Sequence, residues 1–156
     1  MPDDITLRRY ESIDKEAVFN LHVLAISNVK NLPYVSGPWE DDLNNIKEVY
    51  LDNGGEFLVA EINGEIIAMG ALQRISERCA EIKRMRVHPN YWRRGIGQAI
   101  LSRLEVIAKE KGYQVLELDT TIYQESAQRL YLKNNYREVR RGKRGPFESI
   151  FYEKEI

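Results

Sequence analysis

Hydrophobic positions along the chain switch between the two spacings that mark secondary structure, every third or fourth residue for a helix and every second residue for a strand. Helical spacing predicts four helices, and short apolar or alternating runs predict seven strands. The expected helices are residues 15–29, 40–51, 95–112 and 124–134. The expected strands are residues 5–10, 57–62, 66–72, 80–87, 115–118, 138–141 and 149–152.

Two features of this pattern are specific. Asn63-Gly64 stands between two of the expected strands, and both residues tolerate the positive φ that a type I′ turn requires, so a β-hairpin is predicted. The strand at 80–87 alternates poorly, because basic residues are scattered among its apolar ones. Both of its faces are therefore expected to do something other than fill a core.

The order of these elements, with an antiparallel start and a βαβ centre, predicts a mixed α/β fold. No internal repeat or linker interrupts the order, so one domain is expected to cover residues 1–156. Composition agrees with this view: 43% of the residues are hydrophobic and 30% are charged, which is typical of a soluble globular domain.

The charge balance argues against one class of partner. Lys and Arg number 23 and Asp and Glu 24, a net charge of −1, so binding of nucleic acid through overall positive charge is disfavoured. The basic run at 137–144 is interpreted as a solvated turn between strands. No nucleic-acid partner is predicted.

Cysteine and histidine are scarce. Cys79 is the only cysteine, and His22 and His88 are the only histidines, so no disulfide can form within the chain and no zinc spacing exists. A metal-free protein in the reducing cytoplasm is expected. Neither histidine is placed to activate Cys79, which predicts a spectator cysteine, and His22 is expected to lie in the core or line a cleft.

No targeting or membrane segment is expected either. The first residues are acidic where a signal peptide would be basic. No apolar stretch approaches the roughly 20 residues that span a bilayer. Neither export nor a membrane partner is predicted.

The segment 87–99 carries the clearest candidate chemistry, because it places a proline turn, two arginines and two glycines directly before a long predicted helix. The first N–H groups of a helix are unpaired, and glycine lets the backbone approach a ligand closely. Each hydrogen bond to a charged group contributes ~1.5–3 kcal/mol, against ~0.3–1 kcal/mol for the helix dipole. The segment therefore predicts an anion site that the shape of the backbone creates.

Other nucleotide-binding loops do not fit this segment. The chain contains no GxxxxGK[ST], and Gly95-Ile96-Gly97 lacks the third glycine of GxGxxG, so ATP and NAD are disfavoured. On this segment alone, the alternative that the glycines merely begin a helix stays open.

Together with a second segment, this loop resembles the fingerprint of the GNAT superfamily of acetyl-coenzyme A dependent N-acetyltransferases. The family's V-x-P and [Q/R]-x-x-G-x-[G/A] are similar to Val87-His88-Pro89 and to the sequence WRRGIG at residues 92–97. The family's N-x-x-A-x-x-L-Y-x-K-x-G-F is similar to residues 124–136. The resemblance covers nearly the whole chain.

Three positions depart from the family pattern. Trp92 replaces Gln or Arg and is not expected to make the usual polar contact. Gln124 replaces Asn and keeps the amide. Asn135-Tyr136 replaces Gly-Phe, and Asn135 is well suited to a left-handed backbone.

The resemblance implies a central mixed, mostly antiparallel sheet of about seven strands with a parallel central pair, flanked by about four helices. It implies an enzyme that moves an acetyl group from its cosubstrate acetyl-CoA to a primary amine of a small molecule or peptide, by direct attack in a ternary complex. Members often dimerise, so a homodimer is considered. The alternative is a coenzyme A binding domain that senses or regulates without transferring acetyl groups.

The resemblance also assigns the cofactor contacts. Backbone N–H groups of the glycine loop would hold the pyrophosphate, and the preceding strand would splay from its parallel neighbour to pair with pantetheine. A nearby backbone N–H would polarise the thioester carbonyl. The residues so assigned are Met85, Arg86 and Val87 for pantetheine, Arg93, Arg94, Gly95, Ile96, Gly97 and Gln98 for pyrophosphate, and Gln124, Ala127 and Arg129 from the second segment.

Two side chains are implied in catalysis. Glu81 resembles the family's general base, which must deprotonate an amine of pKa ~10.4; the alternative is a solvated glutamate paired with Lys83 or Arg84. Tyr131 resembles the tyrosine beside the cofactor sulfur, where it is a hydrogen-bond donor or general acid to the thiolate. The alternative for Tyr131 is a packed aromatic residue of a helix.

The acceptor in this family lies between the loop after the first helix and the last strands. The residues that would read it are Tyr34, Trp39, Glu40 and Asp41, with Asp42 beside them. An acidic and aromatic lining would suit a cationic amine. The alternative is that these acidic residues only favour the N-terminus of the expected second helix.

Overall fold

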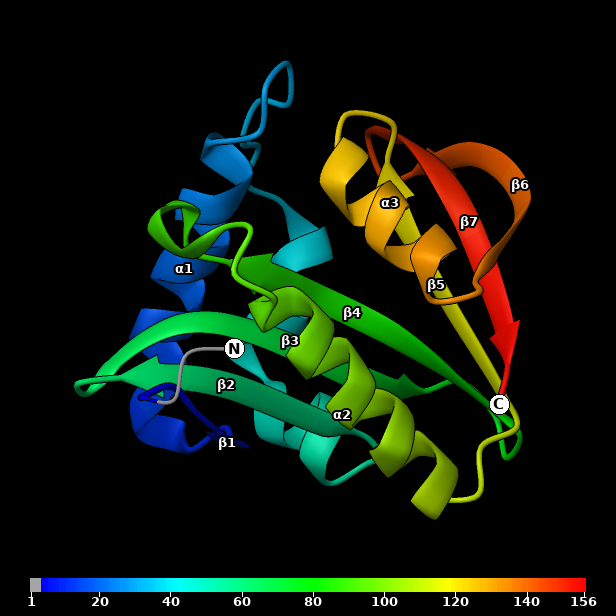
Figure 1. Cartoon of the computed structure of the whole chain (residues 1–156), viewed down its shortest axis with the longest axis horizontal. Helices are drawn as coiled ribbons and strands as arrows, with labels where there is room; N and C mark the ends of the chain where they lie inside the picture. The colour runs from blue at the N-terminus through cyan, green and yellow to red at the C-terminus, as the bar shows by residue number, and fades with distance from the viewer. Residues whose placement is uncertain (1–3) are drawn as a thin grey trace.

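A computed structural model describes residues 4–156 and contains a seven-stranded sheet in the order β1-β2-β3-β4-β5-β7-β6 (Figure 1). The strands are β1 (Thr6–Arg9), β2 (Glu56–Ile62), β3 (Glu65–Arg74), β4 (Cys79–Val87), β5 (Val115–Thr121), β6 (Arg137–Arg144) and β7 (Phe147–Glu155). The α-helices are α1 (Lys15–Ser27), α2 (Ile96–Glu110) and α3 (Glu125–Lys133). The mixed fold predicted from the sequence is confirmed.

Neighbouring strands run antiparallel except for β4 and β5, which pair in parallel. The connection between these two strands passes through α2. Two hydrophobic clusters lie on opposite faces of the sheet: α2 and α3 contribute to one, and α1 and the segment before β2 contribute to the other. Burial of these apolar side chains is the main force that holds the helices on the sheet.

The predicted hairpin between β2 and β3 is confirmed at its turn. Asn63 has φ of 50° and Gly64 has φ of 79°, so both residues are left-handed as a type I′ turn requires. Asn135 is also left-handed, with φ of 70°, as its place in the family pattern predicted.

The single helix predicted at 40–51 is wrong. The structure has a 3₁₀ segment, Pro38–Asn44, followed by a π-helical turn, Lys47–Leu51. Asn45 interrupts them with φ of −137°, and its side-chain amide donates to the carbonyl of Asp41. An Asn side chain that bonds the nearby backbone competes with regular helix geometry, which a pattern of apolar spacing does not detect.

The C-terminal basic run also differs from its interpretation. The run coincides with β6, an exposed edge strand that extends the strand expected at 138–141, rather than with a solvated turn. Lysine and arginine on an edge strand discourage pairing with another chain. Within residues 4–156, no helix is both long and apolar enough to cross a membrane. Residues 1–3, which belong to the acidic segment used in the prediction about targeting, lie outside the described residues.

Gly70 on β3 leaves space where β4 and α2 pack together. A Cβ added there would lie 2.5 Å from Cγ2 of Ile100 and 2.6 Å from the sulfur of Met85. We expect Gly70→Ala to lower the free energy of unfolding by about 1–3 kcal/mol, because the core must shift to admit one methyl group. Urea denaturation measures this change.

Gly97→Ala is the matched control. A Cβ at Gly97 meets its nearest neighbours at 3.8 and 3.9 Å, which is ordinary van der Waals contact. The free energy of unfolding of Gly97→Ala should therefore stay the same or rise slightly, since alanine favours helix. Equal losses of unfolding free energy in the two variants would show that steric crowding at Gly70 does not lower stability.

Candidate active site

The parallel strands β4 and β5 separate shortly after they begin to pair. Only Cys79–Glu81 on β4 has partners on β5, from Val115 to Glu117. Beyond these residues the two strands diverge, as Figure 1 shows in green and yellow. A cavity of about 420 Å³ lies at this split, lined by residues of β4, β5, α1, α3, the loop at 32–39 and the β6–β7 hairpin. The splayed strand that the sequence predicted is present.

A β-bulge in β4 turns several side chains toward this cavity. The register with β3 shifts between Met69 and Ala71, and Arg84 adopts a left-handed backbone with φ of 57°. The Arg84 guanidinium donates to both carboxylate oxygens of Asp42, at 2.9 and 2.6 Å, and to the carbonyl of Trp39. This bidentate ion pair joins β4 to the segment after α1.

Tyr131 lies on α3 with 4% of its surface exposed, and it lines the cavity. Its hydroxyl makes no hydrogen bond to any residue of the described chain. Every fully buried side-chain oxygen or nitrogen in residues 4–156 does have a partner, so this hydroxyl opens into the cavity. Burial raises the pKa of Tyr131 to about 12, although the positive charge of Arg86 opposes the shift.

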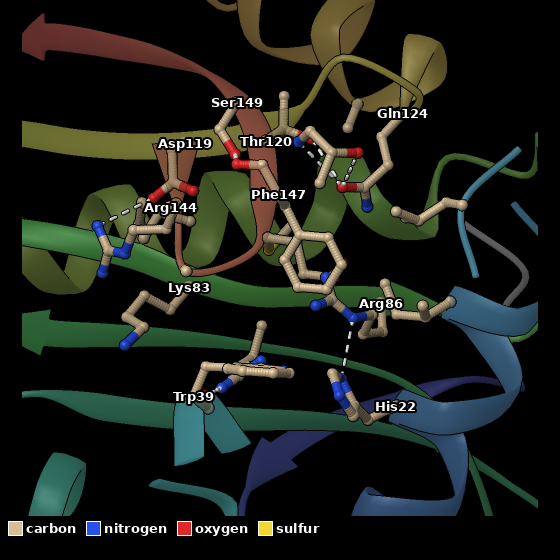
Figure 2. Close-up of a pocket in the computed structure, with 18 of the residues that line it drawn as sticks. His22, Trp39, Lys83, Arg86, Asp119, Thr120, Gln124, Arg144, Phe147 and Ser149 are labelled. Atoms are coloured by element: carbon tan, nitrogen blue, oxygen red, sulfur yellow. Dashed lines mark hydrogen bonds and ion pairs between the residues drawn. The ribbon is translucent and has the colours of Figure 1, made fainter. Parts of the chain in front are cut away.

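Glu81 lies where the β4–β5 pairing ends, and only 7% of it is exposed. Burial raises the pKa of its carboxyl, and the positive charge of Arg144 acts in the opposite direction. The Arg144 guanidinium lies 3.3 Å from Glu81 and 3.2 Å from Asp119, so it bridges β4 and β5. Figure 2 marks its ion pair with Asp119. The alternative of a solvated Glu81 paired with Lys83 or Arg84 is wrong, since Glu81 is buried and its ion-pair partner comes from β6.

A chain of polar contacts runs from Arg86 toward α1. Arg86 Nε donates to Nδ1 of His22 at 3.3 Å, as the dashed line in Figure 2 marks. His22 Nε2 lies 2.8 Å from a carboxylate oxygen of Glu40, and Tyr34 donates its hydroxyl to the same carboxylate. Burial and two neighbouring arginine charges lower the pKa of His22, so the ring is neutral and donates from Nε2.

The glycine loop has the backbone that an anion site requires. Arg93 and Gly95 are left-handed, with φ of 64° and 78°. The first helical hydrogen bond runs from Ala99 N to Gly95 O. In the described part of the chain, the N–H groups of Ile96 and Gly97 have no backbone partner. These donors are therefore free of backbone partners at the start of α2.

Side chains around this loop are used to hold it in place. Trp92 donates its indole N–H to the carbonyl of Val87 at 2.7 Å, so this position makes a polar contact through the indole. Gln98 and Asn134 exchange two hydrogen bonds of 2.9 and 2.8 Å, which tie α2 to α3. The amide oxygen of Gln124 accepts from the backbone of Thr121 at the start of α3.

Some of the remaining predicted cofactor residues line the cavity, and others do not. Met85, Arg86, Gln124 and Ala127 line the cavity. Arg94 is exposed with its guanidinium over the ring of Tyr91, and Arg129 is exposed and donates to Ser126. Val87 is half-buried at the end of β4.

The predicted acceptor residues do not all reach the cavity. Tyr34 and Trp39 line it. Glu40 lies buried behind them, held by His22 and Tyr34, and Asp41 is exposed on the far side of its helical turn. The aromatic residues Tyr34 and Trp39 therefore line the cavity, whereas Glu40 supports His22 and Tyr34 from behind.

Several cavity residues were not predicted from the sequence. Asp119, Arg144 and Phe147 reach it from β5, β6 and β7. Phe147 packs edge to face on Trp39, with 5.9 Å between ring centroids. No local signal marks them, because the register of the C-terminal strands places them there.

The cysteine is not set up as a nucleophile. Cys79 is half-buried at the start of β4, and burial together with Glu117 raises the pKa of its thiol to about 12. A thiol with such a pKa carries almost no thiolate at neutral pH. Within residues 4–156, no group of three His, Cys, Asp or Glu side chains is arranged to hold a metal ion.

Known proteins resemble this chain in sequence and in structure. Residues 23–136 match the acetyltransferase (GNAT) family. IAA acetyltransferase from Azospirillum brasilense is 35% identical over 105 residues, which are 64% of this chain and 67% of that protein. The chain spans 26–47% of the length of further acetyltransferase relatives.

Two solved structures show the same arrangement of elements. An acetyltransferase from Streptococcus agalactiae superposes with a TM-score of 0.89 at 19% identity, over 99% of this chain and 100% of that one. A GNAT acetyltransferase from Elizabethkingia anophelis with acetyl-CoA bound has a TM-score of 0.71 at 23% identity, over 99% and 100% of the two chains. The chain belongs to the GNAT family of acetyltransferases.

Proposed function

We propose that this protein transfers the acetyl group of acetyl-CoA to a primary amine of a small molecule or peptide, by direct attack in a ternary complex. The observation that carries the proposal is the hydroxyl of Tyr131, which opens into the cavity at the β4–β5 split. Membership of the GNAT family supports it.

Two backbone surfaces fit acetyl-CoA. The outward N–H groups at the start of α2 suit a pyrophosphate. Beyond Glu81, the edge of β4 that faces β5 pairs with no strand in the part of the chain described, so we infer that it is open to the amides of pantetheine. When bound, acetyl-CoA supplies an acetyl group activated as a thioester. The relative from Elizabethkingia anophelis, solved with acetyl-CoA, supports this fit.

Glu81 is assigned as the group that accepts the proton of the acceptor. A lysine-like amine has a pKa of ~10.4, so freeing its lone pair at neutral pH costs roughly 4–5 kcal/mol. Burial raises the pKa of Glu81 and makes it a stronger base than an exposed glutamate. The guanidinium of Arg144, which also pairs with Asp119, holds the carboxylate of Glu81 at the split.

Tyr131 is assigned as a hydrogen-bond donor to the departing sulfur. Its pKa of about 12 lies well above the ~8.5 of a thiol, so full transfer of its proton would be uphill by roughly 5 kcal/mol. A hydrogen bond to the developing thiolate needs no such transfer. The phenol therefore stabilises the leaving group while it keeps its proton.

Tyr131→Phe tests this role. We expect turnover to fall roughly 10- to 100-fold, the worth of one hydrogen bond to a charged group, while affinity for acetyl-CoA changes little. Steady-state kinetics with thiol detection, together with calorimetric binding of acetyl-CoA, separate the two quantities.

Tyr136→Phe provides the matched control. Tyr136 packs edge to face on Tyr131, but its hydroxyl donates to Glu105 on α2 rather than opening into the cavity. Its removal should lower stability and leave turnover within about twofold of the parent. Similar losses of turnover in both variants would indicate a packing effect and would count against Tyr131 as the donor.

The proposed activity is tested by release of free thiol from acetyl-CoA across a panel of primary amines, with mass spectrometry of the acetylated product. Thiol release that depends on the amine supports acetyl transfer. The alternative function, a coenzyme A sensor, is favoured if acetyl-CoA raises the melting temperature and no amine in the panel is acetylated.

A further inference from the structure

Charged side chains line the wall of the cavity, and most of them neutralise one another. Asp42 accepts two hydrogen bonds from Arg84. Glu81 and Asp119 share the guanidinium of Arg144. These carboxylates are therefore compensated by cations of the chain itself.

Arg86 is the exception among the arginines of this wall. Its guanidinium donates to the neutral ring of His22 and to the carbonyl of Met85, at 3.3 and 2.9 Å. In the described chain, no carboxylate lies within 4 Å of it. Its remaining nitrogen, NH2, makes no hydrogen bond and is open to the cavity. The wall thus presents a cation with an unused pair of donors.

The support behind Arg86 fixes this orientation. His22 accepts at Nδ1 because its Nε2 hydrogen is directed to Glu40, which is held in turn by Tyr34. The imidazole lies between the Glu40 carboxylate and the guanidinium, so Arg86 forms no direct ion pair with Glu40. Burial and the nearby charge of Arg84 lower the pKa of Arg86 to about 10, and the group stays protonated at neutral pH.

An apolar surface adjoins this cation. Trp39 and Phe147 face each other edge to face, and Figure 2 shows them beside Arg86 and His22. Ile26, Leu32 and Pro38 complete the same wall. A ligand here can bury apolar atoms against the aromatic rings while an anionic group meets the guanidinium.

We propose that the acceptor is an amino acid with an apolar side chain, whose carboxylate binds the guanidinium of Arg86 and whose side chain packs against Trp39 and Phe147. This inference rests on the proposed acetyl transfer. A carboxylate can accept a charge-assisted hydrogen bond from the open Nη2 of Arg86, which an amine without a carboxylate cannot do. It also gives the uncompensated cation a partner, which offsets the cost of holding that charge away from water.

A rival role for Arg86 is contact with the carbonyl oxygen of the thioester. The two roles differ in their dependence on the acceptor. A group that acts on the thioester affects every acceptor equally, whereas a group that binds the acceptor carboxylate affects only acceptors that carry one.

The test measures kcat/KM with acetyl-CoA for the twenty common amino acids and for three matched acceptors: L-phenylalanine, L-phenylalaninamide and 2-phenylethylamine. The parent protein should prefer L-phenylalanine to both analogues. Arg86→Gln should lower this preference at least about tenfold, mainly through KM of the acceptor. Arg86→Lys, which keeps the charge without the fork, should restore part of the preference. Comparing each acceptor between variants cancels differences in amine basicity.

Several outcomes would overturn the inference. Equal losses for all three acceptors would favour the thioester role, and a loss that follows Lys83→Gln instead of Arg86→Gln would place the carboxylate elsewhere. Acetylation of the carboxylate-free amines without any preference for amino acids would refute the acceptor class and leave acetyl transfer standing. Absence of thiol release with every acceptor, amino acids and carboxylate-free amines alike, would contradict the proposed function itself, and this inference with it.

Discussion

Glu81→Gln is expected to lower kcat/KM roughly 10²- to 10⁴-fold near neutral pH, the usual contribution of a general base. The amide keeps the shape of the side chain and cannot accept the proton of the acceptor. In the parent protein, kcat/KM should fall as the pH drops through the raised pKa of Glu81, because protonation removes the base.

The pH profile of the variant separates this role from a structural one. Without the base, the reaction depends on acceptor that is already deprotonated, so activity of Glu81→Gln should climb about tenfold per pH unit up to the pKa of the amine. Recovery at high pH measures this directly. A uniform loss at every pH would show that Glu81 matters through packing or through its ion pair with Arg144.

Glu117→Gln is the matched control for this variant. Glu117 stands opposite Glu81 in the parallel register of β4 and β5, but it is exposed and does not line the main cavity. Its negative charge contributes to the raised pKa of Glu81. Its removal should leave the maximal rate within about twofold and move the acid inflection of the profile to lower pH.

Gly95→Val is expected to abolish detectable binding of acetyl-CoA. Gly95 has φ of 78°, a region that a β-branched residue enters only with strain, so the loop must change shape. Each phosphate hydrogen bond contributes ~1.5–3 kcal/mol, so displacement of two or more donors lowers affinity 100-fold or beyond. At about 100 times Kd, acetyl-CoA stabilises the parent protein by about 2.7 kcal/mol, and this stabilisation should vanish in a thermal shift experiment.

Gly112→Val separates loss of the site from general strain. Gly112 lies just past the other end of α2 with φ of 91°, and its Cβ direction is as open as that of Gly95. Both variants should lose comparable stability without ligand, about 1–3 kcal/mol. Only Gly95→Val should lose the shift with acetyl-CoA; a normal shift in Gly95→Val would remove the loop from the site.

Local chemistry made the fold and the backbone of the glycine loop predictable. Asn63-Gly64 fixes a two-residue turn, and the glycines before α2 leave donors free at the start of a helix. Each of these features is set by residues adjacent in sequence. The helix expected at 40–51 failed because the side chain of Asn45 competes for the backbone, which apolar spacing does not record.

The charged contacts of the cavity could not be predicted from the sequence in the same way. Arg84 takes a left-handed backbone and its guanidinium binds Asp42, a residue distant in sequence. The alternative reading of Glu81 placed its partner nearby in sequence, at Lys83 or Arg84, whereas the partner is Arg144 on β6. Such pairs depend on strand register, which apolar spacing specifies only to within its period of two. The cytoplasmic location and the homodimer stay predictions.

A crystal structure of the protein with acetyl-CoA tests the central claim most directly. We expect the sulfur to lie within hydrogen-bond reach of the Tyr131 hydroxyl, the pantetheine arm along β4 beyond Glu81, and the pyrophosphate on the N–H groups at the start of α2. A ligand that lies outside the β4–β5 split, or a sulfur turned away from Tyr131, would contradict the account.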